Sequence, residues 1–110
     1  MLVDRFRSRG MSVTVKEKRL SRGRERRTFT ATIRPPAGTT AAEVCGDGSV
    51  TLVVDRKGRA FLNRQVRLRR DCTARISFTA KRARKKIHSV SARFGGNTVL
   101  LPARSTRRFS

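Results

Sequence analysis

Three residues of the chain belong to the types that most often carry chemistry: its only cysteines, Cys45 and Cys72, and its only histidine, His88. We expect a disulfide between the two cysteines, and two free thiols are the alternative. A metal site with His88 as third ligand is disfavoured, because the chain contains neither a C-x-x-C nor an H-x-x-x-H spacing. A disulfide would stabilise a small domain by about 3–4 kcal/mol through loop closure.

The sequence offers no catalytic constellation. His88 as a general base would need a nucleophile or an orienting acid beside it, yet there is no G-x-S-x-G motif and the seven acidic residues are scattered. Asp47 and Asp55 lie where turns are expected. The glycines beside Asp47 and those at 95–96 do not form phosphate loops, since neither pair is followed by a helix or by G-K-[ST]. We therefore expect no enzyme activity, no cofactor and no metal.

Basic residues dominate the charge of the chain: 28 Lys and Arg stand against 7 Asp and Glu, for a net charge of +21. One interpretation is a polyanionic partner, such as nucleic acid, an anionic cell-wall polymer or acidic lipid headgroups. The other is that the arginines form solvated strand faces and reflect a GC-rich genome. The candidate contact residues are Arg22, Arg24, Arg26, Arg27, Arg67, Arg69, Lys81, Arg82, Arg84, Lys85 and Lys86.

The aromatic residues argue against a module that reads nucleic-acid sequence. The chain has no Trp and no Tyr, and Phe29, Phe61, Phe78 and Phe94 mostly fall on core positions. Base recognition in single strands usually needs exposed rings for stacking. We therefore expect contact with nucleic acid through charge alone, and the same absence disfavours a sugar-stacking lectin.

Alternation of apolar and polar residues predicts half-buried β-strands in a single domain. The alternation is clear at 27–34, where Phe29, Ala31 and Ile33 share one face, and clearest at 49–55. The expected strands are residues 12–15, 27–34, 49–55, 59–70, 74–80, 87–94 and 104–110.

Turn chemistry and charge predict the connections between these strands. Residues 17–27 indicate a basic loop, residues 39–44 a loop or short helical turn, and Lys57-Gly58 a tight hairpin. Arg64 interrupts the alternation of its strand, which suggests a β-bulge there.

These elements indicate an all-β fold, an immunoglobulin-like antiparallel β-sandwich of about seven strands. Residues 1–11 predict a flexible basic tail or linker, and residues 12–110 form the domain. A bond between Cys45 and Cys72 would tie the beginnings of two strands at one end of the sandwich, outside the buried layer.

Three segments carry a family resemblance: residues 28–38, with a strand that ends in Pro-Pro-Ala-Gly, residues 48–54 and residues 88–97. In this order they resemble the bacterial immunoglobulin-like repeat domains of exported and cell-surface proteins, most closely the arginine-rich, two-cysteine modules of actinobacteria. The resemblance implies a spacer, stalk or adhesive module. It departs from antibody domains in the position of the cysteine pair and in lacking the tryptophan that packs on it.

Two features point in different directions on location. A pair of cysteines suits an oxidising compartment, whereas residues 1–10 lack the apolar core of a signal peptide. No segment is apolar and long enough to span a membrane. We expect a non-catalytic module of an exported or cell-surface protein whose partners are anionic cell-envelope polymers or neighbouring domains. The alternative is a cytoplasmic protein that binds nucleic acid without sequence preference.

Overall fold

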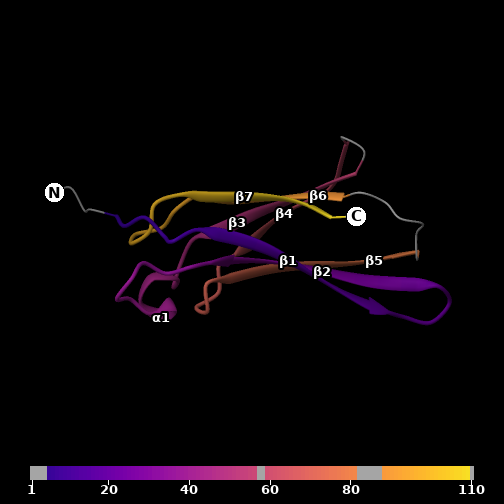
Figure 1. The fold of residues 1–110 in the computed structure, drawn as a ribbon, viewed down its shortest axis with the longest axis horizontal. Coiled ribbons are helices and arrows are strands. Elements are labelled where there is room, and N and C mark those ends of the chain that lie inside the picture. The colour runs from indigo at the N-terminus through magenta and orange to yellow at the C-terminus, as the bar shows by residue number, and fades with distance from the viewer. Residues whose placement is uncertain (1–4, 57–58, 82–87, 110) are drawn as a thin grey trace.

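The computed structural model of the protein describes residues 5–56, 59–81 and 88–109, which form seven strands and one short helix. These elements are β1 (Met11–Arg19), β2 (Arg24–Ile33), α1 (Ala41–Val44), β3 (Ser49–Arg56), β4 (Arg59–Arg67), β5 (Thr73–Lys81), β6 (His88–Phe94) and β7 (Ala103–Phe109). Strands β1-β2-β5 form one antiparallel sheet and β4-β3-β6-β7 the other. Figure 1 shows the two sheets as lower and upper layers. The predicted immunoglobulin-like sandwich is confirmed.

The position of β4 distinguishes this sandwich from antibody constant domains. There the fourth strand joins the sheet of the first, second and fifth strands. Here β4 pairs with β3 and extends the second sheet to four strands. Strand β7, expected as a last edge strand, pairs only with β6 and forms the other edge of this sheet.

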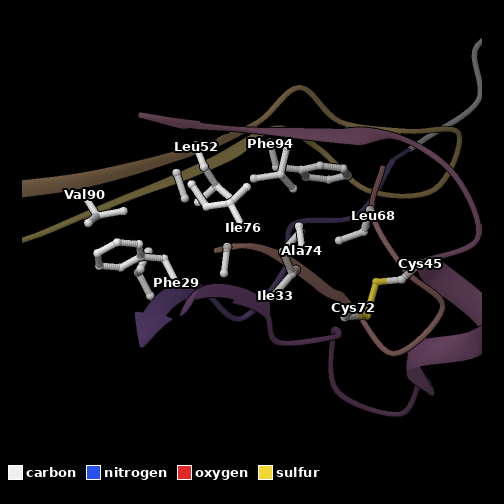
Figure 2. Packing of buried hydrophobic residues seen from close by; sticks show 14 of the residues in the cluster. Phe29, Ile33, Cys45, Leu52, Leu68, Cys72, Ala74, Ile76, Val90 and Phe94 are labelled. Atoms are coloured by element: carbon white, nitrogen blue, oxygen red, sulfur yellow. A yellow bond between two sulfur atoms is a disulfide. The ribbon is translucent and has the colours of Figure 1, made fainter. Parts of the chain in front are cut away.

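The core lies between the two sheets and follows the alternation of the strands (Figure 2). Phe29 and Ile33 of β2 face Leu52 of β3 and Phe94 of β6, and all four are essentially inaccessible to solvent. Phe29 also stacks on Phe78 of β5, with ring centroids 5.8 Å apart. Because burial of each large apolar side chain contributes about 1.5–3 kcal/mol, these alternating residues hold the sheets together.

The basic segment 17–27, predicted as a loop, is instead mostly paired strand, so that prediction is wrong. Strand β1 continues to Arg19, and β2 already begins at Arg24. The turn between them has positive φ angles at Arg22 (60°) and Gly23 (67°), as a type I′ hairpin requires. Charged side chains on both faces of these strand ends hide the alternation on which the prediction depended.

The β-bulge predicted at Arg64 is also wrong. Arg64 pairs in regular register with Leu52, and the register shifts further along, between Val54 and Asp55. Arg64 lies on the inward parity of β4 yet is exposed, because an edge strand lets a long side chain reach solvent. The predicted hairpin at Lys57-Gly58 lies outside the described residues.

Residues 6–10, expected within a flexible tail, run along the sandwich through backbone hydrogen bonds. The amide of Phe6 donates to the carbonyl of Val99, and the amide of Leu101 donates to the carbonyl of Phe6. Further along, the amide of Arg9 donates to the carbonyl of Arg34, and the amide of Arg34 donates to the carbonyl of Gly10. The domain surface therefore includes part of the segment that was expected to precede it.

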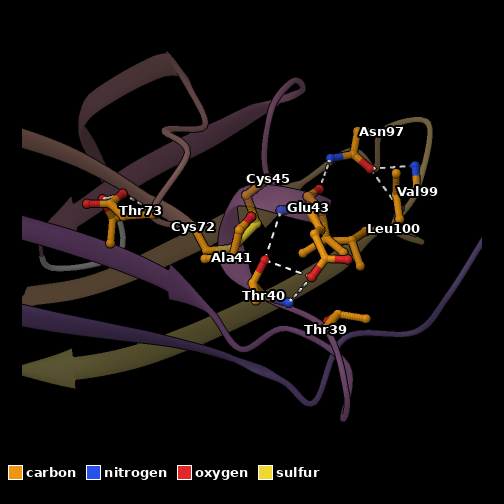
Figure 3. Close-up of a disulfide and its surroundings, with 12 residues drawn as sticks. Thr39, Thr40, Ala41, Glu43, Cys45, Cys72, Thr73, Asn97, Val99 and Leu100 are labelled. Carbon is orange, nitrogen blue, oxygen red and sulfur yellow. Dashed lines mark hydrogen bonds between the residues drawn. A yellow bond between two sulfur atoms is a disulfide. The ribbon is translucent and has the colours of Figure 1, made fainter.

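Cys45 and Cys72 form a disulfide, with 5.2 Å between their Cα atoms (Figure 3). Neither cysteine is a free thiol in this structure, so neither offers a thiolate to a metal site with His88. The two cysteines are 0% and 1% exposed and belong to the core cluster, so the expectation that the bond lies outside the buried layer is wrong. The bond joins the connection from β2 to β3 with the connection from β4 to β5, which are two passages of the chain between the sheets.

The side chain of Asn97 forms a second link at the same end of the sandwich (Figure 3). Its Nδ2 donates to the carbonyls of Val44 (2.8 Å) and Asp47 (3.1 Å). Its Oδ1 accepts from the amides of Val99 (2.8 Å) and Leu100 (2.6 Å). One amide group therefore satisfies four backbone groups and ties the β6–β7 connection to the segment that follows α1.

The helix α1 begins with a capping box, so the helical alternative for residues 39–44 is correct. The amide of Glu43 donates to Oγ1 of Thr40, and the amide of Thr40 donates to Oε1 of Glu43. Such a reciprocal cap satisfies two backbone donors that a helix of four residues would otherwise leave open. It holds Val44 and Cys45 in the buried layer.

Candidate polyanion-binding site

The hairpin formed by β1 and β2 separates its charges by face. Lys16 and Lys18 of β1, and Arg24 and Arg26 of β2, have the parity that points away from the core, and all four are exposed. The glutamates of the same strands have the opposite parity. A hairpin with charged residues on both sides therefore carries only cations on its outer side.

The inward side of this hairpin holds a compact ion-pair cluster. Nε of Arg27 lies 3.0 Å from Oε1 of Glu25 and 3.6 Å from Oε1 of Glu17, which stands directly opposite Arg27 in the register. The side chains of Arg27 and Glu25 are only 14% and 11% exposed. Arg27, predicted as a polyanion contact, is therefore engaged by carboxylates and leaves the candidate set.

The outer side of the sheet β1-β2-β5 forms a surface that we name the β2 face. Its rows run across the three strands; one contains Thr14, Thr30 and Arg75. It combines hydroxyl groups with five exposed cations, and no carboxylate of the described residues has this parity. The residues of the β2 face are Ser12, Thr14, Lys16, Lys18, Arg24, Arg26, Thr28, Thr30, Thr32, Thr73, Arg75, Ser77 and Thr79.

Sequence reasoning identified Arg24 and Arg26 on this face but missed Lys16, Lys18 and Arg75. Lys16 and Lys18 flank the start of the basic segment 17–27, but they were not counted with its later arginines, and Arg75 lies apart from every basic run. The strand register brings the three onto one surface. A signal was present: Lys16 and Lys18 continue the parity of Ser12 and Thr14, so an extended β1 would have placed them on the outer face.

Two like charges stand directly opposite each other on the β2 face. Lys18 is the register partner of Arg26. Opposed like charges on neighbouring strands destabilise a sheet, and neither side chain has an ion-pair partner within the described parts of the chain. A bound anion between these two cations would remove the repulsion.

The outer side of the other sheet, which we name the β6 face, is also basic. It carries four exposed arginines, and Asp55 is its one carboxylate among the described residues. Here too a like-charge pair is opposed, since Arg93 is the register partner of Arg104. The residues of the β6 face are Ser49, Thr51, Val53, Asp55, Asn63, Gln65, Arg67, Ser89, Ser91, Arg93, Arg104, Thr106 and Arg108.

The remaining predicted contact residues do not form one surface. Arg22 lies exposed in the hairpin turn, next to the β2 face, and Arg67 lies on the β6 face. Arg69 is exposed in the turn that precedes Cys72, at the disulfide end. The backbone of Lys81 ends β5 opposite Arg24. The other predicted contacts, Arg82, Arg84, Lys85 and Lys86, lie outside the described residues.

Local hydrogen bonds occupy two of the described carboxylates. Bonds from the side chain and backbone of Thr40 lower the pKa of Glu43, and a bond from the hydroxyl of Thr73 lowers the pKa of Asp71. Within residues 5–56, 59–81 and 88–109, no three His, Cys, Asp or Glu residues come together as a metal site. The described backbone likewise includes no helix with the length and apolar character needed to cross a membrane.

Comparison of the chain with models of protein families, with curated proteins and with solved structures found no match. The features of the chain that bear on function are the two basic faces, the ion-pair cluster and the disulfide.

Proposed function

We propose that the protein is a non-catalytic immunoglobulin-like module of an exported or cell-surface protein, and that it binds an anionic cell-envelope polymer. The observation that carries the proposal is the segregation of charge on the β1–β2 hairpin. Its glutamates are on the core side with Arg27, whereas Lys16, Lys18, Arg24 and Arg26 remain exposed without carboxylates beside them. The outer side of the hairpin is therefore open to an anionic partner, since no carboxylate of the described strands competes for its cations.

The chemistry of the β2 face fits a polymer that carries phosphodiester groups. Arginine forms paired hydrogen bonds with phosphate oxygens, and lysine adds a compact positive charge. Thr28, Thr30 and Ser77 supply hydroxyl donors between the cations. Residues of the same parity on one strand are about 7 Å apart and neighbouring strands about 5 Å apart, so several phosphates of one extended chain can contact the face together.

The buried disulfide supports a location outside the cytoplasm. Disulfides form and persist in oxidising compartments and are rare in the cytosol of mesophiles. The bond between Cys45 and Cys72 lies within the core, so it forms part of the folded state. This favours envelope polymers over nucleic acid as the partner, in agreement with the motif resemblance to bacterial immunoglobulin-like repeat domains.

The test measures binding to poly(glycerol phosphate), a teichoic-type polymer, over ~0.05–0.5 M salt, where charge screening changes strongly. The variant Lys18→Glu/Arg26→Glu reverses the opposed pair of the β2 face. We expect it to lose at least about tenfold in affinity at low salt and to lower the salt slope by roughly 2, or about 1 for each contact removed. The matched control is Arg34→Glu/Arg70→Glu, which changes the net charge equally at two exposed residues, one beyond the end of β2 and one in the turn before Cys72.

Equal loss in the two variants would mean that net charge alone drives binding, and the proposed site would be wrong. Tighter binding of duplex DNA than of poly(glycerol phosphate) at the same salt would favour the nucleic-acid alternative. Thiol titration of denatured protein from its native source is a separate check. Two free thiols there would contradict export.

A further inference from the structure

The β6 face contains a second arrangement of two opposed cations, on the side of the sandwich away from the β2 face. Arg93 of β6 and Arg104 of β7 are register partners, and both side chains are exposed. Neither forms an ion pair with any described residue. Together with Phe94, Pro102 and Ala103 they line a shallow depression of about 280 Å³.

The strands that carry this pair are anchored at the adjoining connection. Asn97 fixes the chain between β6 and β7 through its bonds to Val99 and Leu100. The carbonyl of Leu100 also accepts a bond from the amide of Asn97. The backbone that carries Arg93 and Arg104 is therefore braced, so an anion that binds both arginines loses little entropy in ordering the strands themselves.

Hydroxyl groups surround the arginine pair, as they surround the cations of the β2 face. Thr51 lies next to Arg93 in the same cross-strand row. Ser91 and Thr106 occupy the next row, where their hydroxyl groups share a hydrogen bond of 3.4 Å. The two faces therefore offer the same donors to a phosphate group: two opposed cations flanked by hydroxyls.

The two cation pairs are too far apart for one short anion to contact both. They lie on opposite outer sides of a sandwich whose sheets are separated by about 10 Å of packed side chains. At the edge where β1 approaches β7, Nη1 of Arg107 donates to the carbonyl of Val13 (2.9 Å), so the sheets are joined there. A chain that reached from one pair to the other would have to pass over an edge of the sandwich.

We propose that the domain is bivalent: the β6 face binds a second strand of the phosphodiester polymer at Arg93 and Arg104, and one domain thereby bridges two strands. This inference rests on the proposed function, because it assumes that the β2 face binds the same polymer. The consequence is a cross-linking role. A domain that holds one strand on each side connects neighbouring polymer chains, whereas a domain with one face only coats them.

The experiment counts binding sites with linear hexaphosphate, which is too short to pass around an edge. Native mass spectrometry and titration calorimetry should report two hexaphosphates for each parent chain. They should report one for Arg93→Glu/Arg104→Glu and one for Lys18→Glu/Arg26→Glu. With long-chain polyphosphate, light scattering should reveal cross-linked particles for the parent and for the control Arg34→Glu/Arg70→Glu, but not for either face variant.

The outcomes separate this inference from the proposed function. If the parent binds a single hexaphosphate, or if Arg93→Glu/Arg104→Glu still binds two, the proposal of two binding faces is wrong. The proposed binding site on the β2 face is not contradicted by that outcome. If Lys18→Glu/Arg26→Glu binds like the parent, the proposed β2 site is wrong whatever the β6 face does. Thermal unfolding of each variant establishes that it is folded, and we expect no loss of stability because each reversed pair remains on the surface.

Discussion

The two ends of the sandwich differ in how they use their side chains. At the end near α1, the disulfide, Asn97 and the capping box of Thr40 join segments that are distant in sequence. At the opposite end, the β1–β2 hairpin extends away from α1 with exposed cations on its outer side (Figure 1). The end near α1 is cross-linked, and the opposite end carries the opposed cations of the β2 face.

This difference separates the links that stabilise the fold from the β2 face, the proposed binding site. The disulfide at the α1 end joins two passages of the chain between the sheets, so it opposes separation of the two layers. The cations of the hairpin contribute nothing to that, and Lys18 opposite Arg26 even opposes pairing. Loss of a link at the α1 end should therefore lower stability and leave binding at the β2 face unchanged.

The largest expected effect on stability comes from removal of the disulfide. The variant Cys45→Ala/Cys72→Ala should lose about 3–4 kcal/mol in free energy of unfolding, because the open chain regains the entropy of a long loop. Urea unfolding followed by circular dichroism measures this, with the reduced parent protein as control. Below its unfolding temperature the variant should bind poly(glycerol phosphate) as the parent does. Weaker binding by the folded variant would contradict the separation of the two ends.

The next effect comes from Asn97. The substitution Asn97→Ala should lower the free energy of unfolding by about 2–3 kcal/mol, because the amides of Val99 and Leu100 lose their acceptor. The control Asn97→Asp retains an acceptor for those amides but no donor for the carbonyls of Val44 and Asp47, so it should recover part of the loss. An alanine variant as stable as the parent would show that water replaces the side chain without penalty.

The smallest effect on stability has the opposite sign. Lys18→Glu turns an opposed like-charge pair into an ion pair with Arg26, so we expect a gain of about 0.2–1 kcal/mol in free energy of unfolding, together with weaker polymer binding. Lys16→Glu is the matched control, because its register partner is Thr28. It should weaken binding without the gain. If both variants shift the unfolding temperature equally, the opposed pair does not destabilise the hairpin.

The sequence alone was sufficient to predict those strands in which apolar and polar residues alternate. Val50, Leu52 and Val54 predicted β3 almost to its ends, and Phe29, Ala31 and Ile33 predicted the buried half of β2. The cysteine pairing was also predictable, since only one pair exists. The paired ends of β1 and β2 could not be predicted, because charged residues such as Glu17 and Arg27 stabilise each other across the strands and leave no apolar pattern in the sequence.

The positive charge of the candidate site was predictable from the sequence, but the set of residues that share one surface was not. The predicted residues were taken from runs of adjacent basic residues, whereas the β2 face combines alternate residues of three strands, such as Lys16, Arg26 and Arg75. Which residues share such a surface depends on the register between strands, and the register cannot be derived from any one segment of the sequence. The role of Asn97 was missed for a similar reason, since its partners Val44 and Asp47 are 53 and 50 residues away.

Arg64 has a consequence for how this protein behaves at high concentration. It lies on the inward parity of β4, whose outer edge has no partner strand within the described part of the sheet. An inward-pointing charge on an edge strand opposes the addition of a further strand, because that strand would cover the charge. The residue that interrupts the pattern of β4 therefore opposes edge-to-edge association between copies of the domain.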